Sequence, residues 1–355
     1  MKTRIIAGAA VLATAAAVVA ATPTNATKPG SGSSTGSASI FMVNPVQSSG
    51  DQGLTDQKDS AAAVPASAYA TAVLRNLDGS GHLSGDWANV RTNTGTPAYS
   101  PTNEYFYDRR ADEFEQVMGY FWINEAQEYL QSLGFRPGGP LKPILARPFD
   151  VRIGQYGIDN SFMWSKHDYI RLGKGGVDDA EDAEVIVHEY SHAVHHDQVA
   201  EFGQGLDAGA IGESFGDYFA VTVGLAAADR YGWPVGAEEA CPMDWDATSY
   251  DPTAPHCIRR FDTNRTVATR FGQIHADGQI WSQALWEIRH GYAALGKTTA
   301  DWDTTLIESQ FDYAPDTSWQ AAAKATYLEA QARDGQAFAD LVRGRFAARG
   351  IEFTL

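Results

Sequence analysis

Two histidines and a glutamate are spaced so that they could hold a divalent metal ion and work beside it. The segment His188-Glu-Tyr-Ser-His192 falls inside a long helical pattern that opens near Asp179. Because a helix turns once every 3.6 residues, both imidazoles lie on one face and can bind the same ion. Glu189 follows the first histidine, so its carboxylate can reach a water on that ion without ligating the metal. The segment predicts a zinc site in which Glu189 is the general base.

A zinc site of this kind needs a third protein ligand and leaves its fourth position open. Glu213 is the expected ligand, since it lies 21 positions after His192, where the next helical pattern begins. Asp217 lies four residues further along the same helix face. Its carboxylate can orient a histidine ligand through the second ring nitrogen.

Two further histidines, His195 and His196, follow the motif on the same helix. His196 lies about 12 Å along the axis from His188, so one ion cannot bind all three rings. The zincin series HExxHxxGxxH requires glycine at position 195 and histidine at position 198, and the chain has His195 and Gln198. That class is excluded, and we expect His195 and His196 to be solvated.

The elements that position these residues form a mixed N-terminal half and a helical C-terminal part. Residues 27–40, rich in Ser, Gly, Thr and Ala, predict a low-complexity tether. Residues 41–185 predict an α+β subdomain with short strands, a helix near 114–133 and a hairpin at 160–172. Zinc-site helices and a helical subdomain are expected over 186–355. The last four helical patterns span 280–295, 301–311, 319–333 and 338–349.

Composition and charge limit the function classes. The chain has 355 residues, 44% of them hydrophobic, which suffices for a large core or for two subdomains around a cleft. Its net charge is −17, from 44 acidic and 27 basic residues. Such a surface repels phosphate backbones and anionic lipids, so neither nucleic acid nor a membrane surface is an expected partner.

Residues 1–26 predict an export signal. Lys2 and Arg4 precede an uncharged apolar run, and cleavage could follow Ala20 or Ala26. An uncleaved membrane anchor is the alternative, although the run is near the lower length limit for a span. We therefore expect a secreted chain without membrane attachment after signal cleavage, and we expect it to be a monomer.

The two cysteines, Cys241 and Cys257, fall in one predicted loop. On the far side of an export signal a disulfide is the default, worth roughly 3 kcal/mol for a loop of this size. Two free thiols or a metal pair are the alternatives, although neither a CxxC spacing nor a catalytic cysteine context is present.

The two segments that contain the histidine motif and Glu213 resemble the gluzincin metallopeptidases, specifically the thermolysin and fungalysin families. These segments are Glu184-Val-Ile-Val-His-Glu-Tyr-Ser-His-Ala-Val194 and Gly209-Ala-Ile-Gly-Glu-Ser-Phe-Gly-Asp217, and the resemblance runs from about residue 105 to the end. It implies a two-subdomain α+β fold with the zinc-binding helix at the cleft. It also implies one zinc ion per chain and the hydrolysis of peptide bonds in protein or peptide substrates.

The same resemblance implies roles for residues outside the metal motif. Asn160 and Ser161 lie in a segment similar to the edge strand that binds the substrate backbone in thermolysin-like enzymes. Arg259, with Arg260 as the alternative, resembles the arginine that contacts a substrate carbonyl. His275 resembles the histidine that stabilises the transition state.

The chain departs from the family pattern at three points. Gly212 replaces the asparagine before the glutamate ligand, and no tyrosine occurs between Ala193 and Gly216 to assist the oxyanion. Arg270 stands where the acid that orients the catalytic histidine is expected. The alternative to an active secreted metalloendopeptidase is therefore an impaired zinc-binding homologue that binds proteins or peptides.

Two expectations concern calcium and processing. The acidic stretch 178–184 leaves a calcium site open, although no clear motif supports one. Thermolysin precursors typically carry a long propeptide. Here about 160 residues separate the signal from the metal motif, and the N-terminal subdomain uses most of them, so a short or absent prosegment is expected.

Overall fold

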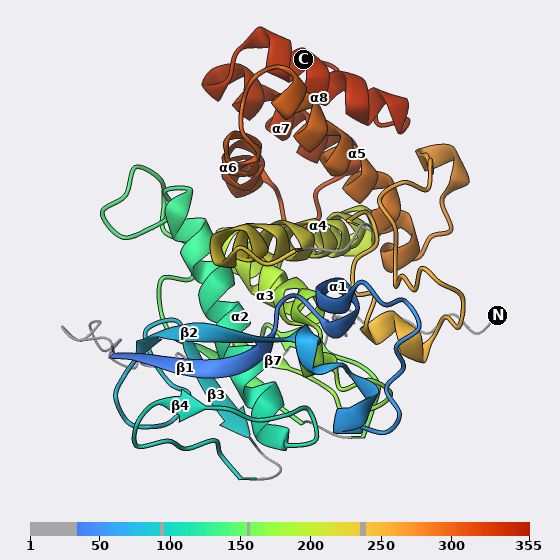
Figure 1. Cartoon of the computed structure of the whole chain (residues 1–355). Helices are drawn as coiled ribbons and strands as arrows, with labels where there is room; N and C mark the ends of the chain where they lie inside the picture. Colours follow the sequence, from blue (N-terminus) through green and yellow to red (C-terminus); the bar gives the residue numbers. More distant parts are fainter. Residues whose placement is uncertain (1–33, 93–95, 155–156, 235–238) are drawn as a thin grey trace, which may run out of the picture.

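The structure is a computed structural model that describes residues 34–92, 96–154, 157–234 and 239–355. The predicted export signal lies outside these residues. Figure 1 shows strands and long helices at one end of the molecule, two crossing helices in the middle and a helical layer at the other end. The predicted α+β fold, mixed in its N-terminal region and helical in its C-terminal part, is confirmed.

Seven strands form two small sheets. The first sheet has the order β2-β1-β4, with β1 antiparallel to β2 and parallel to β4. The second has the order β3-β5-β7-β6, and its last strand is antiparallel to β7. The strands are β1 (Ser34–Phe41), β2 (Tyr69–Leu77), β3 (Ala88–Thr92), β4 (Glu104–Tyr105), β5 (Phe149–Ile153), β6 (Phe162–Trp164) and β7 (Tyr169–Arg171). The β6–β7 pair is the predicted hairpin within 160–172.

The predicted tether over residues 27–40 is wrong from residue 34 onward. Residues 34–40 belong to β1, in which Ala38 and Ile40 are completely buried. Small residues carried too little apolar character to predict a strand, but they let β1 pack closely against its neighbours. The chain then enters the short helix α1 (Pro45–Ser49), whose first turn is capped by the side chain of Asn44.

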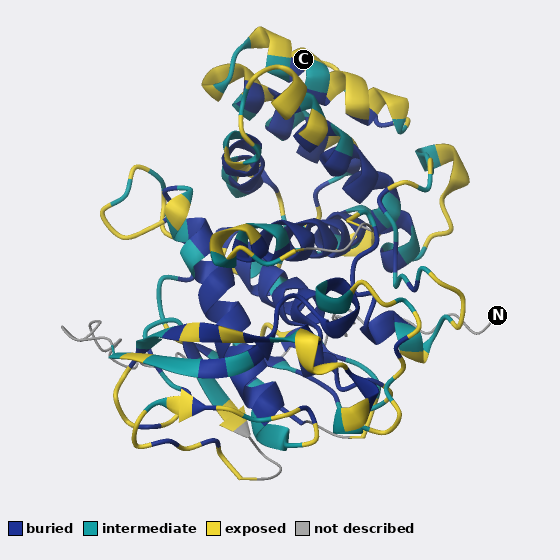
Figure 2. Ribbon diagram, in the orientation of Figure 1, coloured by how far each residue is buried: buried dark blue, intermediate teal, exposed yellow. Residues whose placement is uncertain are grey.

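Three long helices carry the centre of the molecule, where Figure 2 shows almost continuous burial. They are α2 (Asp112–Ser132), α3 (Ala183–Gln198) and α4 (Gly205–Tyr231). Asp182 begins α3 by accepting a hydrogen bond from the Glu184 backbone N–H at 3.0 Å. Because this cap fixes the start of α3 at residue 183, the predicted boundary between residues 185 and 186 falls inside a helix.

The C-terminal layer consists of α5 (Ile274–Ala294), α6 (Thr299–Ser309), α7 (Trp319–Arg333) and α8 (Gln336–Ala348). These helices confirm the four patterns that the sequence predicts, and they bury tryptophans such as Trp281 and Trp302 between them. Short 3-10 helices are η1 (Ala61–Ala63), η2 (Ala66–Ala68), η3 (Asp179–Glu181), η4 (Asp246–Ser249), η5 (Val267–Thr269) and η6 (Gln310–Asp312). Among the described residues, no helix combines the length and apolar character needed to cross a membrane.

Candidate metal centre

Helices α3 and α4 bring the three expected ligands together. His188 and His192 lie one turn apart on α3, with ring centroids separated by 4.9 Å. Glu213 on α4 places one carboxylate oxygen 3.3 Å from His188 Nε2 and the other 3.7 Å from His192 Nε2. The two helices can approach this closely because residue 216 is glycine. A Cβ at Gly216 would lie 2.5 Å from His188 Nδ1.

The donor atoms at this point fit a zinc ion. One atom from each of His188, His192 and Glu213 lies within 4.8 Å of the other two. Within the described part of the chain, both Nε2 atoms and Glu213 Oε2 are buried without a hydrogen-bond partner. Unpaired buried polar atoms are costly, whereas two imidazoles and one carboxylate with an open position form a ligand set that zinc prefers.

The charged and titratable groups at this point shift one another's pKa values. Burial lowers the pKa of His188, but the nearby carboxylates of Asp217 and Glu213 outweigh burial and raise the pKa to about 9. Burial lowers the pKa of His192 to about 4. The pKa of Glu213 is lowered despite burial, because its contact with His188 and the charges of neighbouring histidines favour its ionised form. The Glu213 carboxylate is therefore ionised and can bind a cation.

Asp217 connects the metal ligands to Arg259. Its carboxylate lies 2.9 Å from His188 Nδ1, the ring nitrogen that points away from the ligand cluster. The same carboxylate accepts hydrogen bonds from Arg259 Nε at 2.6 Å and Nη2 at 2.5 Å. This arrangement orients the His188 ring and holds the arginine beside the site.

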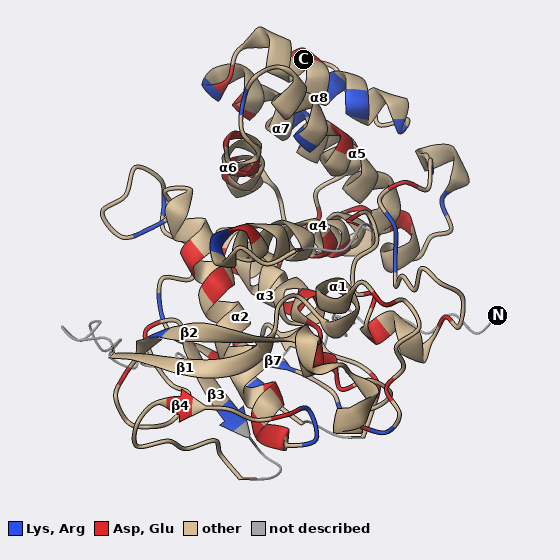
Figure 3. Ribbon diagram, viewed as in Figure 1, with Lys and Arg blue, Asp and Glu red and all other residues tan. Residues whose placement is uncertain are grey.

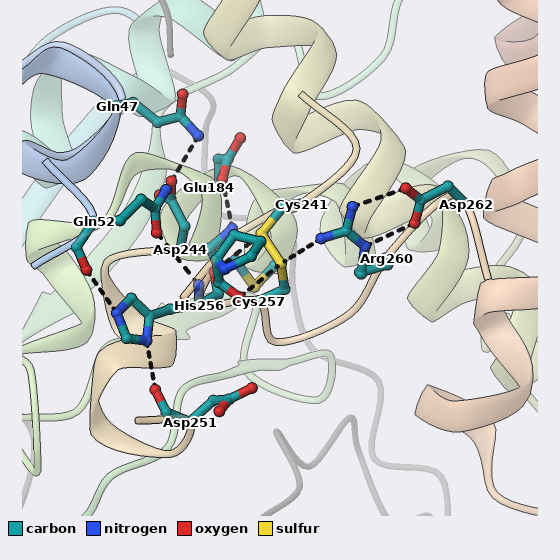
Figure 4. The surroundings of a disulfide bond; sticks show 12 residues. Gln47, Gln52, Glu184, Cys241, Asp244, Asp251, His256, Cys257, Arg260 and Asp262 are labelled. Atoms are coloured by element: carbon teal, nitrogen blue, oxygen red, sulfur yellow. Dashed lines mark hydrogen bonds and ion pairs between the residues drawn. A yellow bond between two sulfur atoms is a disulfide. The ribbon is translucent and has the colours of Figure 1, made fainter. Parts of the chain in front are cut away.

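The Arg260 side chain, unlike that of Arg259, binds residues outside the candidate metal centre. Its guanidinium donates to both carboxylate oxygens of Asp262, and Nη1 contacts the sulfur of Cys257 (Figure 4). Cys257 is joined to Cys241 in the predicted disulfide, with the two Cα atoms 5.2 Å apart. Of the two arginines considered as carbonyl clamps, Arg259 is the one beside the metal ligands.

Glu189 lies next to the ligands and also contacts the second sheet. Its carboxylate accepts a hydrogen bond from the backbone N–H of Met163 in β6, and burial raises its pKa to about 7. Its Oε2 atom is buried without a hydrogen-bond partner among the described residues. This oxygen is therefore able to take up a proton.

His275 comes to the site from the first turn of α5. Its Nε2 lies 3.3 Å from Glu213 Oε2, and burial lowers its pKa to about 4. Gln273 Nε2 contacts His275 Nδ1 at 2.6 Å, while the amide oxygen of Gln273 caps α5 through the Ala276 N–H. An amide donor at Nδ1 places the ring proton on Nε2, which faces the site.

Gln273 is a residue that the sequence analysis missed. Arg270, which stands at the position expected for an orienting acid, instead pairs with Asp207 at 2.6 Å. The signal that could have found Gln273 is its position as the N-cap of α5, two residues before His275.

The expected substrate-binding residues lie in the segment that leads into β6. Ser161 is buried, and its hydroxyl donates to the Asp179 carboxylate and accepts from the Gly173 N–H. The Ser161 side chain is therefore committed to the fold, so any substrate contact at this residue would use the backbone. Asn160 beside it is half-buried.

His195 is buried, so its predicted solvation is wrong. Its ring packs between Phe202 and Phe215, with centroid distances of 4.4 and 4.5 Å, and burial lowers its pKa to about 3.

The hydroxyl groups of the two tyrosines within or beside the motifs bond to residues other than the candidate ligands. Tyr190 donates to Gln127, and Tyr218 donates to Asp303.

Comparison with known proteins identifies a family and a solved structure that are similar to this chain. The family described as Fungalysin metallopeptidase (M36) matches residues 145–310, which include α3, α4 and α5. A search of curated proteins finds no match. Among solved structures, the chain resembles the precursor of protealysin, a metalloproteinase from Serratia proteamaculans, with 16% identity and a TM-score of 0.53 over 75% of this chain and 86% of that chain. The expected resemblance to the gluzincin metallopeptidases of the thermolysin and fungalysin type is thereby confirmed.

Proposed function

We propose that the chain is a secreted zinc metalloendopeptidase with one zinc ion, held by His188, His192 and Glu213. The observation that carries this proposal is the meeting of two imidazoles and a carboxylate from two helices beside the Glu189 carboxylate. Bound zinc would supply a Lewis acid for the scissile carbonyl and lower the pKa of the attacking water. The Cys241–Cys257 disulfide suits an oxidising compartment, which agrees with the predicted export signal.

The residues around the metal ligands have the chemistry that peptide hydrolysis needs. Glu189 would accept a proton from the attacking water and pass it to the leaving amine. The N–H of Met163 holds one side of that carboxylate, which fixes its direction. His275, with its Nε2 proton set by Gln273, would donate to the oxyanion, a role that neither Tyr190 nor Tyr218 can take because each donates elsewhere.

Substrate would lie along β6, which ends the second sheet. An extended peptide can add to such an edge through backbone hydrogen bonds, so Asn160 and Ser161 would contact the substrate main chain at its entry. Arg259 uses Nε and Nη2 to hold Asp217, so Nη1 is the group that would face a substrate carbonyl. The expected substrates are proteins or peptides, cleaved by a monomer.

Replacement of Glu189 by glutamine tests the proposal. The variant should keep about one zinc per chain, because Glu189 is not a ligand, and should lose 10²- to 10⁴-fold in the rate of casein cleavage. Metal analysis and a casein assay on wild type, Glu189→Gln and the matched exposed control Glu201→Gln give the comparison.

Casein cleavage by Glu189→Gln at a near wild-type rate would disprove the mechanism. Absence of zinc from the wild-type protein would disprove the metal site. A wild type that binds one zinc and cleaves nothing would favour the peptide-binding alternative, which the lack of a tyrosine between Ala193 and Gly216 motivates.

A further inference from the structure

The outer face of the second sheet carries arginine and aromatic side chains beside the proposed substrate edge. The sheet has the order β3-β5-β7-β6, so β6 is an edge strand. Side chains alternate between the two faces of a strand. In β6, Met163 is buried against the interior, whereas Phe162 is half-buried and Trp164 is 36% exposed. Phe162 and Trp164 therefore share the face that points away from the core.

Arg171 of β7 lies on this same face among three aromatic rings. It stands opposite Phe162 in the β6–β7 register, and Tyr169 stands opposite Trp164. The guanidinium carbon of Arg171 lies 5.0 Å from the centroid of the Trp164 ring. The centroids of the Tyr169 and Phe162 rings are 5.3 and 5.7 Å away. Aromatic faces at these distances attract a cation, so they hold the charge of Arg171 beside β6.

This part of the molecule is basic in an acidic chain. The net charge is −17 overall, whereas residues 147–171 contain four basic and three acidic residues. Each of these three acids is held by another group: Asp150 by Arg91 at 3.6 Å, Asp168 by Arg147, and Asp159 by the Tyr250 hydroxyl. Figure 3 shows basic residues on β3 and close to β7, whereas acidic residues are frequent in the loops beside α1. The outer face of the second sheet therefore favours a negatively charged group.

We propose that Arg171 selects substrates that place a glutamate side chain over the outer face of β6. This inference rests on the proposed function, because it concerns a peptide that adds to β6 as a further strand. Every second side chain of such a peptide would lie on the face of Phe162 and Trp164. The peptide would lie two strand spacings, or about 10 Å, from β7, and extended arginine and glutamate side chains can span this gap between them.

Arg152 of β5 shows why the proposal concerns Arg171 alone. It stands opposite Arg171 in the β5–β7 register and on the same face, with its guanidinium carbon 3.6 Å from the centroid of the Tyr169 ring. It lies one strand farther from the edge, at three strand spacings, or about 14 Å, from an added peptide. Arg152 is therefore too distant to pair with a substrate carboxylate, and it provides a matched control.

The experiment uses the zinc-loaded full chain and short quenched fluorescent peptides in which one position at a time is glutamate, glutamine or lysine. At one position on the β6 side of the scissile bond, KM should be roughly 5-fold lower for the glutamate peptide than for the glutamine peptide. The immediately adjacent positions should show no such preference, because their side chains point to the opposite face. In about 1 M NaCl the preference should disappear, because salt screens exposed charges.

Substitutions of Arg171 separate its charge from its packing. Arg171→Gln should bring the two KM values together, and Arg171→Lys should keep most of the preference for glutamate. Arg171→Glu should reverse the preference in favour of the lysine peptide, a result that a purely structural arginine would not give. Arg152→Gln should retain the preference of the wild type.

Binding to Glu189→Gln distinguishes failure of this inference from failure of the proposed function. Fluorescence polarisation with the zinc-loaded variant gives Kd for the same peptides without cleavage. If the wild type cleaves nothing, the proposed function fails, and a roughly 5-fold Kd preference for glutamate that requires Arg171 still supports this site. Equal Kd values would overturn it.

An active wild type with equal KM values for the glutamate and glutamine peptides at every position would overturn the inference and leave the proposed function intact. A glutamate preference that persists in Arg171→Gln, or that Arg171→Gln and Arg152→Gln lose equally, would overturn it as well.

Discussion

A single carboxylate, that of Asp217, joins the candidate metal ligand His188 to Arg259, the residue expected to hold substrate. It contacts His188 Nδ1 on one side and the Arg259 guanidinium on the other. Burial raises its pKa, but the charge and hydrogen bonds of Arg259 outweigh burial, so the pKa of Asp217 is lowered. The ionised form that orients a histidine ligand is thus maintained inside the protein.

Gln273 contacts the His275 ring, and under the proposed function its removal should affect turnover more than binding. Gln273→Ala frees the His275 ring to adopt its other tautomer, so we expect kcat to fall about 10-fold with KM little changed. Loss of the α5 cap should also cost about 1 kcal/mol of stability. Steady-state kinetics and urea unfolding measure the two effects.

The control for this experiment is Gln279→Ala on the same helix, whose amide oxygen instead accepts the Arg260 N–H. It should leave kcat unchanged. An equal loss of kcat in both variants would mean that helix α5 as a whole, rather than the Gln273 amide, sets the rate.

At the scale of elements, the junction between α2 and η3 contains a pair of buried acids. Burial raises the pKa of Asp178 to about 6, and burial together with the Asp178 charge raises the pKa of Glu115. Lys174 lies 4.0 Å from Glu115 and offsets only part of this repulsion. Since the folded state binds a proton here more tightly than the unfolded chain, the pair costs stability above about pH 6 and costs nothing below about pH 4.

Glu115→Gln should therefore stabilise the protein at pH 8 by about 1 to 2 kcal/mol, because one of the two buried charges is gone. At pH 4 Glu115 is largely protonated in both the folded and the unfolded state, so wild type and variant should have nearly equal free energies of unfolding. Urea denaturation at the two pH values provides the test. Glu113→Gln on the same helix should change little at either pH, and a gain at pH 4 as large as at pH 8 would refute the argument.

The elements that could be predicted from the sequence are those that are long and have a regular spacing of apolar residues. Helices such as α2 and α7 repeat apolar residues every three to four positions over several turns, so their pattern identified them. Strand β1 was missed, because its serines, glycine and single alanine carry little hydrophobicity and gain their burial only from the sheet and helix that cover them.

At the scale of the whole molecule, the proposed zinc ion would join α3 to α4. Removal of zinc should lower the melting temperature by roughly 5 °C or more, because three buried donor groups lose their shared partner. The chain should remain folded, since His188 can pair with Asp217 and Glu213 when it is protonated.

Differential scanning calorimetry of Glu189→Gln before and after treatment with 1,10-phenanthroline measures this effect. Added Zn²⁺ should restore the original melting temperature and added Mg²⁺ should not. An identical melting temperature with and without the metal would show that the three side chains do not share an ion.

The sequence by itself determined the chemistry of the centre. The four-residue spacing of His188 and His192 on a helix, with Glu189 beside the first, follows from local geometry that one segment specifies. Glu213 and Asp217 followed from the same reasoning on a second helix, together with the resemblance to known families. Local spacing survives folding unchanged, because a helix fixes the relative directions of its own side chains.

Only the tertiary structure decided which distant residues join these helices. It brought Gln273 to His275, chose Arg259 over Arg260, buried His195 and gathered Asp159, Asp179 and Asp246 around one point. Contacts of this kind depend on how three or more segments pack, and packing is set by the summed burial of the whole core rather than by the identity of any one residue.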